Sequence, residues 1–188
     1  MTTVPMLKAS DNTAGQMADD QRAVVIAPAT GLSDRLLDPA CGQLRDSVLR
    51  LGRVRAVVRL PKGLVTARPR EQLTMWVLGP SYDHIPADER WTMLADLANV
   101  ALTADVVDDL VTDLVASMGD QATVRSHAFR FTRMVTTRIL LASRGNLVEV
   151  APRIEPARAG AAADVVGRDA TLQDALQDDR DLGPMNFS

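Results

Sequence analysis

The residues with the clearest chemical potential are basic side chains gathered in one short stretch of the chain. Guanidinium and ammonium groups bind phosphate oxygens, and such contacts give nucleic-acid affinity that falls as salt rises. Side chains alternate along a strand, so residues 53, 55 and 59 share one face. The stretch supports two hypotheses: contact with DNA, or arginines that are solvated or paired with acidic groups. The candidates for DNA contact are Arg53, Arg55, Arg59, Lys62, Arg68 and Arg70.

Other reactive residue types show no spacing that indicates catalysis or metal binding. His84 and His127 stand far apart in the sequence, and neither has metal-ligand spacing to Asp or Cys. The lone Cys41 excludes an intrachain disulfide and a cysteine-rich zinc site. We therefore identify no catalytic residue and no metal site. A group of aspartates is assigned to the solvent face of a helix: Asp105, Asp108, Asp109 and Asp113.

The segment Asp38-Pro-Ala-Cys-Gly42 has the residue types of a cofactor loop, an acidic residue followed by a glycine turn. Gln43 and Leu44 follow where a second glycine would be needed for close backbone approach to a ligand. The preferred interpretation is a loop that leads into a helix, with Asp38 and Gly42 considered as cofactor-binding residues and discounted. The alternative is a relic or functioning cofactor loop.

Length and charge suggest one domain with tails. The chain has 188 residues, 24 acidic against 21 basic, and a net charge of −3. Between Arg45 and Arg70, eight basic residues stand against Asp46 alone, a local net charge of +7. No apolar run approaches the roughly 20 residues of a membrane span. We expect a soluble cytoplasmic protein that makes no membrane contact.

The elements that must position these residues follow from hydrophobic pattern and breakers. Apolar runs predict strands at 22–28, 54–60 and 72–78, the first of them β-branched and of the parallel-sheet kind. The alternating segment 91–96 is either a fourth strand, which we favour, or the first turns of a helix. Helical spacing predicts helices at 42–51 and 103–118, and a last short strand or extended segment is expected at 146–150. The predicted organisation is a flexible leader (1–21), an α/β domain (22–150) with a mixed sheet and flanking helices, and a flexible tail (151–188).

Two motifs in this order carry a family resemblance: Gly52-Arg-Val-Arg-Ala-Val57, and the strand end Leu60-Pro-Lys-Gly63, followed by an antiparallel strand at 73–78. The arrangement resembles the C-terminal half of the methyltransferase domain of N6-adenine DNA methylases, the modification-subunit type of type I restriction systems. The resemblance covers about residues 22–150. It implies a partial class I methyltransferase-like, Rossmann-like fold.

The chemical motifs of that family are not carried over. Its catalytic loop, Asn/Asp-Pro-Pro-Tyr/Phe, holds the flipped adenine, and this chain has no Pro-Pro pair. The resemblance therefore implies a truncated or degenerate methylase with no cofactor of its own, S-adenosylmethionine being bound only if a partner chain completes the site. The family sheet places a strand like Ala23–Ala27 beside the catalytic strand. If that neighbour is missing, the apolar edge is expected to pair with another copy or with a complementary methylase chain. The alternatives are a non-enzymatic α/β module that binds nucleic acid or protein, and an active methyltransferase that uses Asp38–Gly42.

Overall fold

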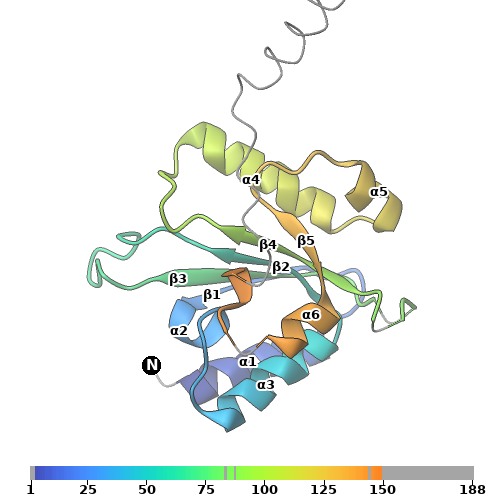
Figure 1. Cartoon of the computed structure of the whole chain (residues 1–188), viewed down its shortest axis with the longest axis horizontal. Coiled ribbons are helices and arrows are strands. Elements are labelled where there is room, and N and C mark those ends of the chain that lie inside the picture. The colour runs from blue at the N-terminus through green and yellow to red at the C-terminus, as the bar shows by residue number, and fades with distance from the viewer. Residues whose placement is uncertain (1–2, 83, 87, 144, 150–188) are drawn as a thin grey trace, which may run out of the picture. The chain divides into compact units, whose positions relative to one another are not determined.

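The computed structural model describes residues 3–149 except 83, 87 and 144, and all of these belong to one compact unit. The predicted tail at 151–188 lies outside the described residues. Five strands form one sheet in the order β1-β3-β2-β4-β5 (Figure 1). The strands are β1 (Ala23–Pro28), β2 (Val54–Arg59), β3 (Leu73–Leu78), β4 (Trp91–Asp96) and β5 (Arg133–Thr136). The helices are α1 (Thr3–Gln16), α2 (Ala29–Leu32), α3 (Pro39–Arg50), α4 (Ala104–Ser117), α5 (Gln121–Ser126), α6 (Thr137–Ala142) and the 3-10 turn η1 (Leu147–Glu149).

The sheet is mixed, which confirms the predicted fold class. β3 runs antiparallel to both β1 and β2, β2 and β4 are parallel, and β5 returns antiparallel to β4. The four predicted strands are present, including 91–96. The parallel-sheet assignment of the first strand is wrong, because β3 lies between β1 and β2 and is antiparallel to β1.

Helices cover both faces of the sheet and give two apolar cores (Figure 1). α1, α2, α3 and α6 lie on one face, which we call the α3 face, and α4 and α5 lie on the other, the α4 face. Val57, Trp76 and Leu94 point into the core of the α3 face. Val58, Met93 and Leu97 point into the core of the α4 face. The central strands are therefore apolar on both sides, which explains their nearly continuous hydrophobic sequence.

The predicted flexible leader is corrected by the structure, because residues 3–16 form α1. Met6, Leu7 and Ala14 are buried on one side of this helix, which packs against α3. Ser10 is also buried, and its hydroxyl donates to the Met6 carbonyl at 3.1 Å. A buried face made partly of Ser and Ala gives a weak hydrophobic pattern, so the helix is hard to see in the sequence.

Two other boundaries differ from the sequence prediction. α3 starts at Pro39 rather than Gly42, since Asp38 caps it by accepting from the Ala40 N–H at 2.9 Å. It ends before Gly52, whose φ of +67° suits a glycine after a helix. The last predicted strand is instead the 3-10 turn η1, in which Leu147 and Val148 bury their side chains in the core of the α3 face.

Candidate functional site

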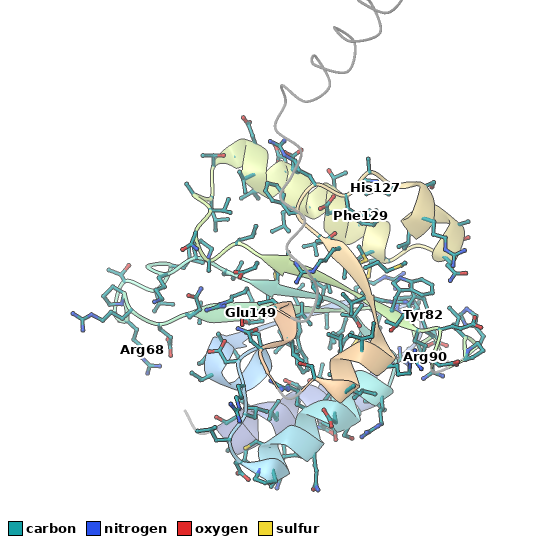
Figure 2. All side chains as sticks on the ribbon, viewed as in Figure 1. Arg68, Tyr82, Arg90, His127, Phe129 and Glu149 are labelled. Carbon is teal, nitrogen blue, oxygen red and sulfur yellow. The ribbon has the colours of Figure 1, made fainter. Side chains whose placement is uncertain are left out.

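The structure separates the six basic candidates into three groups. Arg53 and Arg55 lie at the start of β2, Arg59 lies at its end, and the other three lie in the loop to β3. Figure 2 shows Arg68 at one end of the sheet and Tyr82, which contacts Arg55, towards the other. The predicted common face therefore does not form one continuous basic surface.

A β-bulge explains the unexpected position of Arg55. The pairing of β2 with β3 shifts register between Val54 and Ala56, which leaves Arg55 without a partner in the ladder. Bulges re-aim side chains. Here the guanidinium is turned to the α4 face, where its Cζ lies 2.9 Å from the centre of the Tyr82 ring. Gly79 makes room, since a Cβ there would lie 3.0 Å from Arg55 Cγ and 2.7 Å from Met118 Sδ.

Arg55 is a buried cation for which the described residues provide no carboxylate partner. Only 2% of the residue is exposed, and within the same part of the chain its Nε and one terminal nitrogen have no hydrogen-bond partner. Burial, together with the positive charges of Arg22 and Arg53, lowers the pKa of Arg55 to about 9. Arg53 is different, because it pairs with the exposed carboxylate of Asp19 at 3.1 Å. The side chains of both arginines are therefore engaged in contacts within the fold.

Arg59 sits where the parallel strands β2 and β4 end together. It stands opposite Asp96 in the strand register and lies 3.9 Å from that carboxylate. Its other neighbour is Glu149 of η1, 3.4 Å away. Arg133 of β5 also approaches Asp96, and burial lowers the pKa of Arg133 while that carboxylate opposes the shift. The cluster ties η1 and β5 to the ends of β2 and β4.

The loop between β2 and β3 holds the basic residues that remain at the surface. Lys62, Arg68 and Arg70 are all exposed. Arg68 pairs with Glu71 at 3.3 Å, an exposed i,i+3 contact of small energetic value. Of the six candidates for DNA contact, these three are exposed.

The Asp38–Gly42 segment forms the N-cap and first turn of α3, where the preferred interpretation expects a loop that leads into the helix. The Asp38 carboxylate caps the helix and also accepts from the Cys41 thiol at 3.3 Å. Burial and the neighbouring Asp38 raise the pKa of the Cys41 thiol, so it is not an activated nucleophile. A cavity of about 340 Å³ opens beside this segment and is lined in part by Asp38, Gly42 and Arg45.

The outer edge of β1 is open among the residues that the structure describes. β1 pairs only with β3 and ends the sheet. Its Ala23, Val25 and Ala27 face the core of the α3 face, whereas Val24 and Ile26 are 58% and 56% exposed. An apolar groove of about 210 Å³ runs beside the edge, between β1 and α1. The predicted unpaired apolar edge is therefore present.

The backbone groups along this edge can be assigned from two hydrogen bonds. The Ala29 N–H donates to Gln72 O at 2.7 Å, and the Leu60 N–H donates to Leu73 O at 2.9 Å. Residues 72 and 73 thus bond to opposite neighbours, and hydrogen-bonded pairs alternate along an antiparallel ladder. It follows that Val25 and Ala27 bond to β3, while the N–H and C=O groups of Val24 and Ile26 point to the open side.

Comparison with known proteins bears on the fold. No protein-family model matches the chain, and no curated protein matches it in sequence. Among solved structures, the type I restriction-modification methyltransferase subunit from Streptococcus thermophilus matches with a TM-score of 0.52 and 12% identity. The match covers 70% of this chain and 26% of that one. The fold is methyltransferase-like. The chain therefore corresponds to about a quarter of that subunit's length.

Two further structures give weaker matches. A chain from a structure of the assembly and conformational transition of the type I restriction-modification system has a TM-score of 0.47 and 11% identity, over 89% of this chain and 36% of that one. The type IIG restriction endonuclease BpuSI has a TM-score of 0.45 and 10% identity, over 74% and 15%. The resemblance drawn from the Gly52–Val57 and Leu60–Gly63 motifs is confirmed for the fold.

One buried carboxylate was missed by the sequence prediction. Asp113 was placed on the solvent face of α4 but is only 2% exposed. It accepts hydrogen bonds from the backbone N–H groups of Arg130, Phe131 and Thr132, and it contacts His127 Nε2 at 3.2 Å. The loop that it holds leads into β5. A helix pattern cannot reveal such a partner, because the loop is far away in sequence.

The described part of the chain contains no group of three or more His, Cys, Asp or Glu side chains arranged to hold a metal ion. Within the same residues, no helix combines the length and apolar composition that a bilayer crossing requires.

Proposed function

We propose that the chain is a partial N6-adenine DNA methyltransferase-like module of a restriction-modification system that is not catalytic alone. In this proposal a complementary methylase chain pairs with β1 and brings the cofactor and adenine-binding motifs. The open edge of β1 carries the proposal, because the resemblance places the catalytic strand of the family next to this strand. The proposed compartment is the cytoplasm, and S-adenosylmethionine is bound only in the completed assembly.

Two features of the residues support the absence of independent catalysis. The 188 residues contain no Pro-Pro pair, so the adenine-holding Asn-Pro-Pro-Tyr motif is not encoded in them. The Asp38 carboxylate is engaged by the Ala40 N–H and the Cys41 thiol, which leaves it poorly placed to hold a cofactor. Methyl transfer to adenine needs both a cofactor site and a pocket for the flipped base.

A calorimetric titration with S-adenosylmethionine tests this proposal. We expect no binding by the purified chain at millimolar cofactor. The second arm adds the product of an adjacent reading frame that encodes Asp-Pro-Ala-Cys-Gly-Ser-Gly and Asn-Pro-Pro-Tyr, and binding should then appear. Stoichiometric micromolar binding by the chain alone would contradict the proposal. In that case Asp38→Asn, compared with Asp46→Asn on the same helix, would show whether Asp38–Gly42 is the cofactor loop.

A second candidate is a non-enzymatic α/β module that binds nucleic acid through the loop between β2 and β3. The observation that favours it is the exposure of Lys62, Arg68 and Arg70 in one loop. The test is fluorescence anisotropy with a labelled DNA duplex. Lys62→Ala with Arg70→Ala should weaken binding several-fold and lower the salt dependence by about two ions, since each phosphate contact releases roughly one counterion. Lys8→Ala, an exposed change on α1, is the control. An unchanged affinity in the double variant would exclude this loop.

A further inference from the structure

The sequence of the open strand is symmetric about its centre. Ala23-Val24-Val25-Ile26-Ala27 has Val25 at the middle, β-branched residues on either side of it and alanine at both ends. When two copies of a strand pair antiparallel about a twofold axis, the residues equidistant from the axis face each other. With the axis at Val25, Val24 faces Ile26 of the second copy, and Ala23 faces Ala27 of the second copy.

The backbone groups match this register. The N–H and C=O groups of Val24 and Ile26 point to the open side, as derived above from the bonds of Ala29 and Leu60. Val24 would form a hydrogen-bonded pair with Ile26 of the second copy, and Ile26 with Val24 of the second copy. In each pair the two residues exchange both N–H···O bonds. Val25, whose backbone groups bond to β3, would meet its own copy as a non-hydrogen-bonded pair. Pro28 has no N–H, so the ladder would end there in each copy.

The side chains fit on both faces of the strand. On the α4 face, the exposed Val24 and Ile26 would cover Ile26 and Val24 of the second copy and remove four apolar side chains from water. On the α3 face, α1 borders the strand and leaves the groove of about 210 Å³ lined by Ala9, Thr13 and Ala27. The second copy brings Ala23, Val25 and Ala27 to this face, and of these only Val25, at the axis, is larger than alanine. The larger pairs of Val24 with Ile26 meet on the other face, where the surface is open.

The two ends of the sheet differ in how they are protected. Edge strands in soluble proteins are commonly kept short or guarded by charges and prolines. β5 has four residues, begins with a charged arginine and leads directly into α6. β1 has no charged residue among Ala23–Ala27. The residues that disfavour edge pairing, Arg22 and Pro28, lie only at its two ends. β1 is therefore the edge that is suited to pairing.

We propose that a second copy of this chain pairs with β1 through an antiparallel twofold contact centred on Val25. The five described strands of each copy then form one continuous sheet across the dimer. This contact occupies the edge that the proposed methylase partner would use, so the two associations exclude each other. The dimer does not depend on the proposed function, and it holds whether or not a methylase partner exists.

Sedimentation equilibrium of the full chain over a range of concentrations, with reductant present, is the first test. We expect a concentration-dependent dimer. Ile26→Lys should weaken dimerisation by roughly tenfold or more, because it places an ammonium group in the apolar contact. The control is Ile139→Lys on α6, where the side chain is similarly exposed at 46%; it should leave the dimer intact. A monomer at every concentration, or a dimer that Ile26→Lys does not affect, would overturn the proposal.

Cysteine cross-linking tests the register independently. In a Cys41→Ala background, Val25→Cys should form a disulfide between copies under mild oxidation. Non-hydrogen-bonded pairs hold Cα atoms about 4.5 Å apart, within the range for a disulfide. Val111→Cys, at a half-exposed position on α4, should not cross-link at the same concentration. Equal cross-linking of the two variants would contradict this register. Neither experiment uses cofactor or DNA, so its failure is distinguishable from a failure of the proposed function.

Discussion

The position of Arg55 shows how a β-bulge can decide which face of the sheet a side chain occupies. Period-two counting puts it on a basic face with Arg53 and Arg59, but the bulge at Val54/Ala56 turns it under Tyr82 instead. The apolar character of the strand is readable from sequence. The bulge is not, because it depends on the pairing of β2 with β3. The burial of Asp113 is equally invisible in the sequence, because it depends on the contact of α4 with the loop at residues 130–132.

Replacing Arg55 by methionine should stabilise the isolated chain. A buried cation with unpaired nitrogens costs free energy, and an apolar side chain of similar length removes that cost. We expect Arg55→Met to raise the free energy of unfolding by about 1–2 kcal/mol at pH 7, after allowance for the lost contact with Tyr82. Urea denaturation measures the change. Arg53→Met, which removes a pair with an exposed carboxylate, should change stability by less than about 0.5 kcal/mol.

The free energy of unfolding gained by Arg55→Met should decrease as pH rises. The folded pKa of Arg55 is about 9, well below its usual value, so the folded chain binds fewer protons than the unfolded chain between these two values. The cost of burying the charge is full below about pH 9 and is relieved as pH rises above it. The difference between Arg55→Met and the unchanged chain should therefore shrink between pH 7 and about pH 10. A difference that grows with pH would contradict the assignment.

At the scale of elements, the strands were more predictable than the flanking helices. β2, β3 and β4 are marked by mostly apolar runs ended by Pro61, Gly79 and Asp96. α1 was missed because its buried side includes Ser10 and Ala14, which carry little hydrophobic signal. Part of its stability comes from packing on α3, a contact that the local sequence does not display.

Leu7 provides the test of α1. Its side chain is fully buried in the core of the α3 face. Leu7→Ala should lower the free energy of unfolding by about 3 kcal/mol, because it removes buried methyl groups and leaves a cavity. Lys8→Ala, at the neighbouring exposed position, should change it by less than about 0.5 kcal/mol. Denaturant unfolding distinguishes the two. Equal, small effects would mean that α1 does not contribute to the core.

At the scale of the whole molecule, fold class was readable from sequence and strand order was not. Alternating strands and helices indicate a mixed α/β sheet, and the Leu60-Pro-Lys-Gly63 turn indicates the antiparallel return of β3. Nothing in β1 itself reveals that β3 will lie between it and β2. The candidate site shares this limit. The apolar edge could be anticipated from Ala23–Ala27, but the direction of its free backbone groups required the bonds of residues 72 and 73.

The insertion of β3 between β1 and β2 has a kinetic consequence. Among the five described strands β1 is synthesised first, yet its only neighbour in the described sheet begins at Leu73, about fifty residues later. During translation both edges of β1 stay unpaired until β3 has left the ribosome. Contacts between distant residues also slow folding, because the intervening loop must close first. The nascent chain therefore passes through a period in which the segment Ala23–Ala27 is most exposed to wrong pairing, before the native sheet exists to hold it.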